Sequence, residues 1–118
     1  MRNVEDYLRD MLAYTQDVES MHITSLEVIT SNRIIELVAM RAYEVLSEIT
    51  KHLPQTLLDS QPQVGWRVLK GFRDFLIHQY CCVNPTALWN AVQDLPNLKA
   101  AVSAMLQSLE SADRSEQA

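Results

Sequence analysis

The chain has 118 residues, enough for one domain, and hydrophobic residues make up 47% of it. With only two glycines and four prolines, this composition favours a packed helical domain over a disordered chain. The formal net charge of −5 argues against a general, nonspecific nucleic-acid binder, which would normally be basic.

The N-terminal residues lack the pattern of an export signal. Charged side chains at Arg2, Glu5 and Asp6 interrupt any apolar run, so we expect no signal peptide. No stretch approaches the roughly 18 consecutive apolar residues that indicate a membrane span, and we expect no membrane association. Cys81 and Cys82 are adjacent, which does not suit a structural disulfide, so we expect a cytoplasmic protein with reduced thiols.

Apolar residues recur at helical spacing from the N-terminus onward. Residues 3–22 predict a first helix, and Thr24 or Ser25 is expected to cap a short turn over Leu26–Ile29. A long helix is predicted over residues 31–53. The apolar face that we expect this helix to turn towards the core comprises Ile34, Ile35, Val38, Ala42, Val45, Leu46 and Ile49.

Prolines divide the second half of the chain. Pro54 is expected to end the long helix, and residues 55–63 are predicted to form a connector. A helix is predicted over residues 64–79. Asn84 followed by Pro85 is typical of a helix start, with asparagine as the cap and proline in the first turn.

The last helical segment contains Pro96, which must kink or split it before residues 98–109. From residue 110 the sequence is polar, so we expect a domain over residues 1–109 and a polar C-terminal tail over residues 110–118. Four or five amphipathic helices with short links predict an all-α fold, an up-and-down helical bundle.

One group of polar side chains suggests chemistry. Arg73 stands five residues before His78, and Tyr80 follows two residues later, in the pattern R-x4-H-x-Y. An arginine fork binds phosphate through paired hydrogen bonds, and a histidine exchanges protons near neutral pH. On an ideal helix Arg73 and His78 lie roughly 140° apart, so they could meet only in a cleft beside the helix that the long arginine reaches into. The pattern suits phosphodiester cleavage.

Other residues of the same segment could support this chemistry. Asp74 lies four residues before His78 and could orient its imidazole, while Arg67 and Lys70 are candidates for RNA phosphate contacts. His22 and the other histidines are far apart in sequence, so we expect no metal site. RNA carries its own nucleophile, the 2′-hydroxyl, and we expect no cofactor. The alternative interpretation is that the R-x4-H spacing arose by chance and that His78 is an ordinary helical residue.

The sequence around this motif resembles a known family. Residues 64–80 read V-G-W-R-V-L-K-G-F-R-D-F-L-I-H-Q-Y and resemble the W-R-x-[IVL]-x-G-[MF]-R-[ND]-x-L-[IV]-H-x-Y signature of HepT-like proteins of the HEPN superfamily. Residues 41–54 resemble the family's R-x-x-E-[IV]-[IL]-G-E-A…K-x-L-P block, and residues 83–99 resemble its V-D…[VL]-W…D-L-P-x-L-K block. The resemblance spans nearly the whole chain, in the family's order.

Three positions depart from the family pattern. Ser47 replaces the usual glycine, and Gln79 stands where glycine is common. Asp74 takes a position often held by asparagine, which changes how the His78 imidazole would be held.

The resemblance implies a metal-independent ribonuclease, the toxin of a type VII HEPN/MNT toxin–antitoxin system. The partner would be a cognate minimal nucleotidyltransferase (MNT) antitoxin, and the toxin would form a homodimer with its RNA site near the subunit cleft. Arg73 and His78 would be catalytic. Tyr80 would contact the substrate and would accept AMP from the antitoxin as O-AMP-tyrosine. Arg41 and Glu48 would border the site or the dimer interface.

Two other functions stay open. The chain could be a noncatalytic helical dimer whose Arg73 and His78 face docks a protein or a nucleotide. It could also be a structural dimer in which His78 is buried and satisfied. Arg41, Glu44 and Glu48 share one side of the long helix, and the structural alternative to a role beside the site is that they form a solvated, salt-bridged face.

Overall fold

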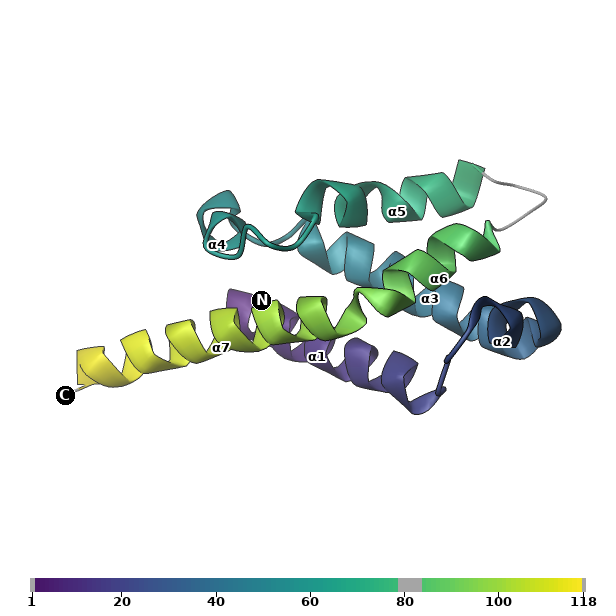
Figure 1. Ribbon diagram of the computed structural model, residues 1–118. Coiled ribbons are helices and arrows are strands. Elements are labelled where there is room, and N and C mark those ends of the chain that lie inside the picture. The colour runs from purple at the N-terminus through teal and green to yellow at the C-terminus, as the bar shows by residue number, and fades with distance from the viewer. Residues whose placement is uncertain (1, 79–83, 118) are drawn as a thin grey trace.

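The computed structural model describes residues 2–78 and 84–117, apart from the side chains of Arg73, of residues 75–78 and of Gln117. These residues form seven helices and no strand (Figure 1). The helices are α1 (Val4–Ser20), α2 (Leu26–Ser31), α3 (Arg33–Thr50), α4 (Gln55–Asp59), α5 (Trp66–His78), α6 (Pro85–Gln93) and α7 (Leu95–Gln117). The predicted all-α fold is confirmed, with two short helices, α2 and α4, beside five longer ones.

Asparagine side chains begin three of the helices. Asn3 caps α1 in a capping box, in which Asn3 and Asp6 each accept a hydrogen bond from the other's backbone N–H. Asn32 caps α3, and Asn84 caps α6 with Pro85 in the first turn, as predicted. Each of these side chains satisfies backbone N–H groups that have no partner within the helix.

The region around Pro54 differs from the prediction. The long helix ends at Thr50, and the N–H groups of the next three residues, 51–53, bond to the carbonyls three positions earlier. Such tightened turns are frequent at helix ends, and the residue before a proline is disfavoured in the α conformation. Pro54 then stands at the N-terminus of α4, which lies within the predicted connector over residues 55–63.

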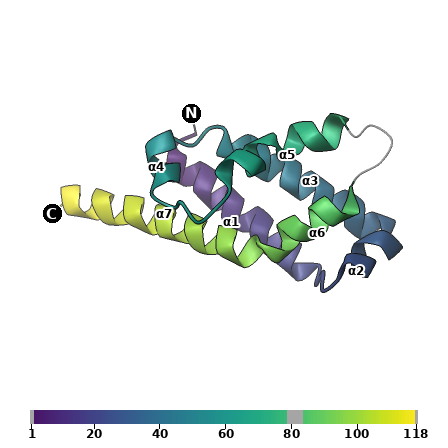
Figure 2. The same ribbon diagram turned by 45° about the horizontal axis from the view of Figure 1, so that its top comes forward.

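The split at Pro96 is confirmed. Helix α6 ends before Asp94, and Pro96 lies in the first turn of α7, where its missing N–H costs nothing. Helix α7 continues to Gln117, and residues 111–116 are exposed. Figures 1 and 2 show its last turns extending past the N-terminal end of α1. The domain boundary after residue 109 stays a prediction.

The longer helices pack side by side in the order α5, α3, α1, α7, and α6 covers parts of α2, α3 and α7 (Figure 2). The fully buried side chains between them include Leu8, Met11, Tyr43, Leu46, Leu88 and Met105. Two buried threonines, Thr15 and Thr50, donate their hydroxyls to carbonyls of their own helices. Among the described residues, no helix has the length and apolar character needed to cross a membrane.

The predicted apolar face of the long helix is wrong at its N-terminal end. Ile34 and Val38 are 73% and 49% exposed, and Leu37 beside them is 42% exposed. Helix α3 is apolar on two sides, and periodicity alone does not say which side faces the core. The predicted residues Ala42, Leu46 and Ile49 are buried, and Ala39, Tyr43 and Ser47 lie on the core side with them.

Candidate active site

Helix α5 carries the predicted motif on one continuous helix. Arg73 and His78 both lie within it, so the helical spacing assumed for R-x4-H holds for the backbone. Asp74 is exposed on the same helix. The side chains of Arg73 and His78 lie outside the described residues, as do Tyr80 and the two cysteines, so the catalytic assignments stay predictions.

Three contacts fix α5 in the bundle. Phe72 is buried and its ring lies 5.5 Å from the ring of Tyr43 on α3. The Ser47 hydroxyl on α3 donates to the Lys70 carbonyl at 2.9 Å. Trp66 is buried at the start of α5, and its Nε1 donates to the Gln61 carbonyl at 2.9 Å. Since Phe72 points into the core, the opposite side of α5 is left for polar residues.

The two α3–α5 contacts also give the relative direction of these helices. Tyr43 meets Phe72 and Ser47 meets Lys70, so α3 and α5 run in opposite directions. Arg41, just before Tyr43 on α3, therefore lies level with the half of α5 that follows Phe72. Arg41 is exposed and pairs with Glu44 at 3.3 Å.

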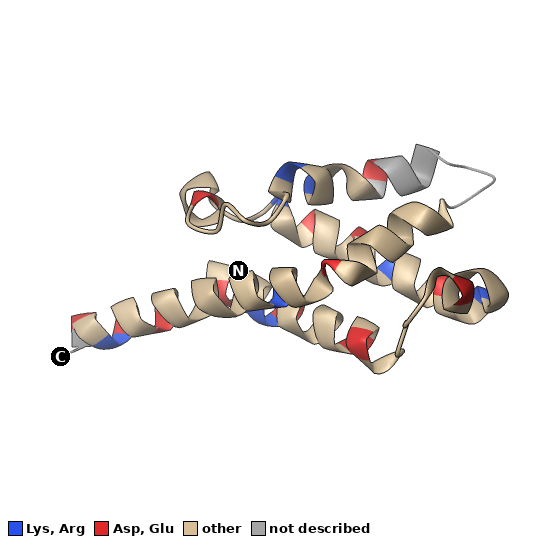
Figure 3. Ribbon diagram, viewed as in Figure 1, with Lys and Arg blue, Asp and Glu red and all other residues tan. Residues whose placement is uncertain are grey.

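The basic side chains at the start of α5 are placed differently from one another. Figure 3 shows basic positions clustered there. Arg67 is exposed and has no ion pair among the described residues, whereas Lys70 is half-buried with its Nζ 3.5 Å from the Gln55 side-chain oxygen. Arg67 is thus the freer of the two for binding a phosphate. Within the described part of the chain, no group of three His, Cys, Asp or Glu side chains is arranged to hold a metal ion.

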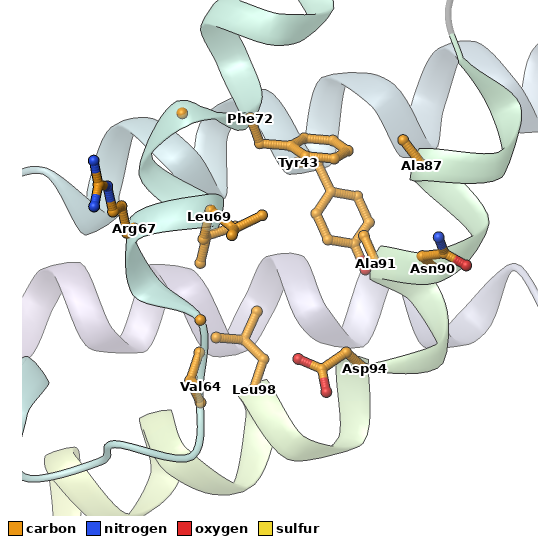
Figure 4. A pocket seen from close by; sticks show the side chains of 13 residues that line it. Tyr43, Val64, Arg67, Leu69, Phe72, Ala87, Asn90, Ala91, Asp94 and Leu98 are labelled. Carbon is orange, nitrogen blue, oxygen red and sulfur yellow. The ribbon is translucent and has the colours of Figure 1, made fainter.

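A cavity of about 610 Å³ lies against α5 (Figure 4). The described residues that line it come from α3, the segment before α5, α5, α6 and α7. Most are apolar, and the polar ones are Tyr43, Arg67, Asn90 and Asp94. Of these the sequence singled out only Arg67. For Asn90 and Asp94 the only local signal in the sequence is their i, i+4 spacing, and Tyr43 has none. These residues come together only when four helices pack around the cavity.

Tyr43 is the most unusual residue of this cavity. It is 1% exposed, and its hydroxyl has no hydrogen-bond partner among the described residues. Burial, together with the negative charge of Asp94, raises the pKa of the Tyr43 phenol well above its usual value. The group is therefore a neutral hydroxyl that can donate a hydrogen bond.

Comparison with known proteins identifies the family. Residues 5–105, which include all of α5, match the family model described as "Ribonuclease HepT-like". "Probable ribonuclease HepT" of Thermococcus cleftensis is 30% identical over 100 residues, which cover 83% of this chain and 91% of the relative. "Putative RNase MJ0125" of Methanocaldococcus jannaschii is 28% identical over 111 residues, which cover 92% of this chain and 96% of the relative. No solved structure matches the chain. The protein belongs to the HepT-like ribonuclease family.

Proposed function

We propose that the protein is a metal-independent endoribonuclease, the toxin of a type VII HEPN/MNT toxin–antitoxin system. The observation that carries the proposal is the position of Arg73 and His78 on one continuous helix, α5, in a chain of the HepT-like ribonuclease family. The curated relatives carry names of ribonucleases, which supports the same reaction class for this chain.

The proposed reaction uses the 2′-hydroxyl of RNA as the nucleophile. His78 takes the proton of this hydroxyl, the 2′ oxygen bonds to phosphorus, and the bond from phosphorus to the 5′ oxygen breaks. The leaving oxygen takes up a proton from a general acid or from water. The guanidinium of Arg73 balances the negative charge on the phosphate oxygens, and Asp74 orients His78. Arg67, Lys70 and Arg41 hold neighbouring phosphates of the RNA.

An RNA cleavage assay with chelator tests this reaction. The purified protein should cleave RNA equally with and without EDTA, and His78→Ala should lower the rate by about 10²–10⁴-fold. His22→Asn is the matched control, because asparagine tolerates the positive φ of 52° at this position while also removing an imidazole. Chelation that stops cleavage, or a native rate in His78→Ala, contradicts the proposal.

We further propose a homodimer formed through α3. Ile34, Leu37 and Val38 are exposed on one side of this helix, and together we call them the α3 apolar face. Exposed apolar residues grouped in this way are a common mark of protein interfaces. Arg41 follows this face on α3, level with the half of α5 that holds His78. In the proposed homodimer a second copy bound to the α3 apolar face would bring its own Arg41 towards this half of α5.

Control by the antitoxin is proposed to act on Tyr80, by transfer of AMP to its hydroxyl. The added phosphate competes with RNA for Arg73, and the adenine blocks entry to the site. The test is co-expression with the cognate nucleotidyltransferase, followed by intact-mass measurement and peptide mapping. An AMP adduct on Tyr80 with loss of toxicity supports the proposal. Full neutralisation of Tyr80→Phe with unchanged mass shows control by binding alone.

The alternative function is a noncatalytic helical dimer that binds a nucleotide or a protein. The cavity beside α5 is the observation that favours it, since its size falls within the range of about 300–1,000 Å³ typical of small-molecule sites. The cleavage assay separates the two functions, because a binding module leaves RNA intact.

A further inference from the structure

The cavity beside α5 combines apolar walls with a few polar groups. Val64, Leu69, Phe72 and Leu98 are among its walls, so its interior suits a flat, largely apolar ring (Figure 4). Sites for small ligands share this composition, in which the apolar walls bind and a few polar groups choose the ligand.

The polar groups lie at different places on the cavity wall. Figure 4 shows the ring of Tyr43 reaching from α3 towards α6, with its hydroxyl end beside Ala91. Asn90 lies in the last turn of α6, and Asp94, four residues further on, is the C-cap of that helix; both side chains are exposed. Arg67 lies across the cavity from them (Figure 4).

The Tyr43 hydroxyl is a donor that the fold itself leaves unused. Leaving a buried polar group unpaired is costly, and such groups are rare in folded proteins. Like any tyrosine at neutral pH, Tyr43 carries its phenol proton, and the hydroxyl therefore has a hydrogen bond to give. A ligand with an acceptor atom in the cavity satisfies it.

The Asp94 carboxylate offers the matching acceptors. Its Oδ1 accepts one hydrogen bond from Asn97 at 3.3 Å, which leaves further acceptor positions on both oxygens. Two oxygens side by side fit a ligand with two adjacent N–H donors. Among the four RNA bases, guanine alone has this pair, at N1 and the 2-amino group. Adenine and cytosine place an acceptor nitrogen next to their amino group, and uracil has a single N–H between two carbonyls.

We propose that the cavity binds a guanine base. The Asp94 carboxylate accepts from N1–H and the 2-amino group, and the Tyr43 hydroxyl and Asn90 amide donate to the acceptors of the base. Arg67, on the opposite side, is exposed and its guanidinium points outward from the cavity, where it would meet a phosphate only outside the base site. This inference goes beyond the proposed cleavage, because a base can bind here whether or not the chain cuts RNA.

The first experiment is calorimetric titration of the full chain with guanosine, inosine, adenosine and cytidine. Guanosine should bind most tightly. Inosine, which lacks only the 2-amino group, should bind at least about tenfold more weakly, since it loses a hydrogen bond to a charged group. Equal affinity for guanosine and adenosine overturns the assignment.

The second experiment uses variants of the cavity. Asp94→Asn should weaken guanosine binding at least about tenfold, and Tyr43→Phe should weaken it about 3–10-fold. Asp17→Asn is the matched control, since this exposed carboxylate of α1 lies outside the cavity and the charge change is the same. A guanosine affinity that is the same in all three variants overturns the proposal.

A third experiment separates the two sources of the base, a free nucleotide or an RNA chain. The His78→Ala variant is titrated with guanosine and adenosine monophosphates in one arm, and with single-stranded oligoribonucleotides that contain or lack guanine in the other. Guanine preference in either arm, lost in His78→Ala combined with Asp94→Asn, supports the pocket and identifies its source. Absence of guanine preference in both arms overturns it. This titration measures binding in a variant that is not expected to cleave RNA. Its outcome is therefore independent of the cleavage assay that tests the proposed ribonuclease activity.

Discussion

At the scale of single residues, the buried hydroxyl of Tyr43 has no partner among the described residues. An unsatisfied buried polar group costs about 1–3 kcal/mol, so Tyr43→Phe should raise the free energy of unfolding by about 1 kcal/mol in urea denaturation. Tyr14→Phe, a half-buried tyrosine of α1, serves as the control and should change stability less. A loss of stability in Tyr43→Phe means that the hydroxyl has a structural partner.

The same residue gives the fold a pH dependence. The folded-state pKa of Tyr43 is raised, while the unfolded-state value is near 10. Above about pH 10 the unfolded chain therefore releases a proton that the folded chain keeps, and stability falls as pH rises. Between pH 10 and 12 the native protein should lose up to about 1.4 kcal/mol per pH unit more than Tyr43→Phe. Parallel pH curves for the two proteins would falsify this.

Arg73 tests the role of guanidinium geometry. A lysine at this position keeps the charge but offers a point charge where phosphate requires a planar fork. We expect Arg73→Lys to lose most of its RNA cleavage and its toxicity in growing cells. The paired control is Arg33→Lys, an exposed arginine at the start of α3. Growth arrest as strong as with the native protein shows that Arg73 is a surface charge.

At the scale of elements, the Ser47 hydroxyl links α3 to α5 through the Lys70 carbonyl. Ser47→Ala should destabilise the protein by about 1 kcal/mol and should speed hydrogen exchange of the α5 amides more than elsewhere. Thr50→Val is the control, because that buried hydroxyl bonds within α3 to Leu46 and crosses to no other helix. Equal effects on α5 in both variants mean that the Ser47 bond does not hold this helix in place.

Local signals predicted some elements and not others. The asparagine and proline at the start of α6 and the proline at the start of α7 act within a few residues, so these boundaries were predictable. The short helix α4 has five residues and no side-chain cap, so it leaves little trace in the sequence. Pro54 is the nearest stop signal in the sequence and predicts a helix end at Leu53, whereas the α-helix already ends at Thr50 in a tightened last turn.

At the scale of the whole molecule, the α3 apolar face is the basis for the proposed homodimer. Val38→Glu should shift the protein from dimer to monomer in light scattering at micromolar concentration, because a buried unpaired charge is costly. Ala13→Glu, exposed on α1, adds the same charge outside this face. A native protein that is already monomeric, or a Val38→Glu protein that stays dimeric, excludes this interface.

Tertiary structure explains what the sequence could not predict. The fold class and the helical motif segment follow from periodicity and turn residues, which are properties of the chain read in order. The cavity is lined by Tyr43 together with Asp94 and Leu98, which are far apart in the chain. Hydrophobic periodicity describes only neighbouring residues and cannot predict that they share a cavity. Periodicity also predicts that Ile34 and Val38 are buried, and they are exposed. Only the packed bundle shows which side of α3 is covered.

The positions of the two tryptophans make the protein its own optical reporter. Trp66 is buried at the start of α5 and stands in the sequence between Gly65 and Arg67, while Trp89 directly precedes Asn90, so each tryptophan is a sequence neighbour of residues that line the cavity. A purine bound in the cavity contacts the helices that carry both tryptophans, and we expect the emission wavelength and quantum yield of the indoles to change with it. Trp89→Phe leaves a single emitter at the start of α5. Occupancy can then be followed by fluorescence without attaching a dye.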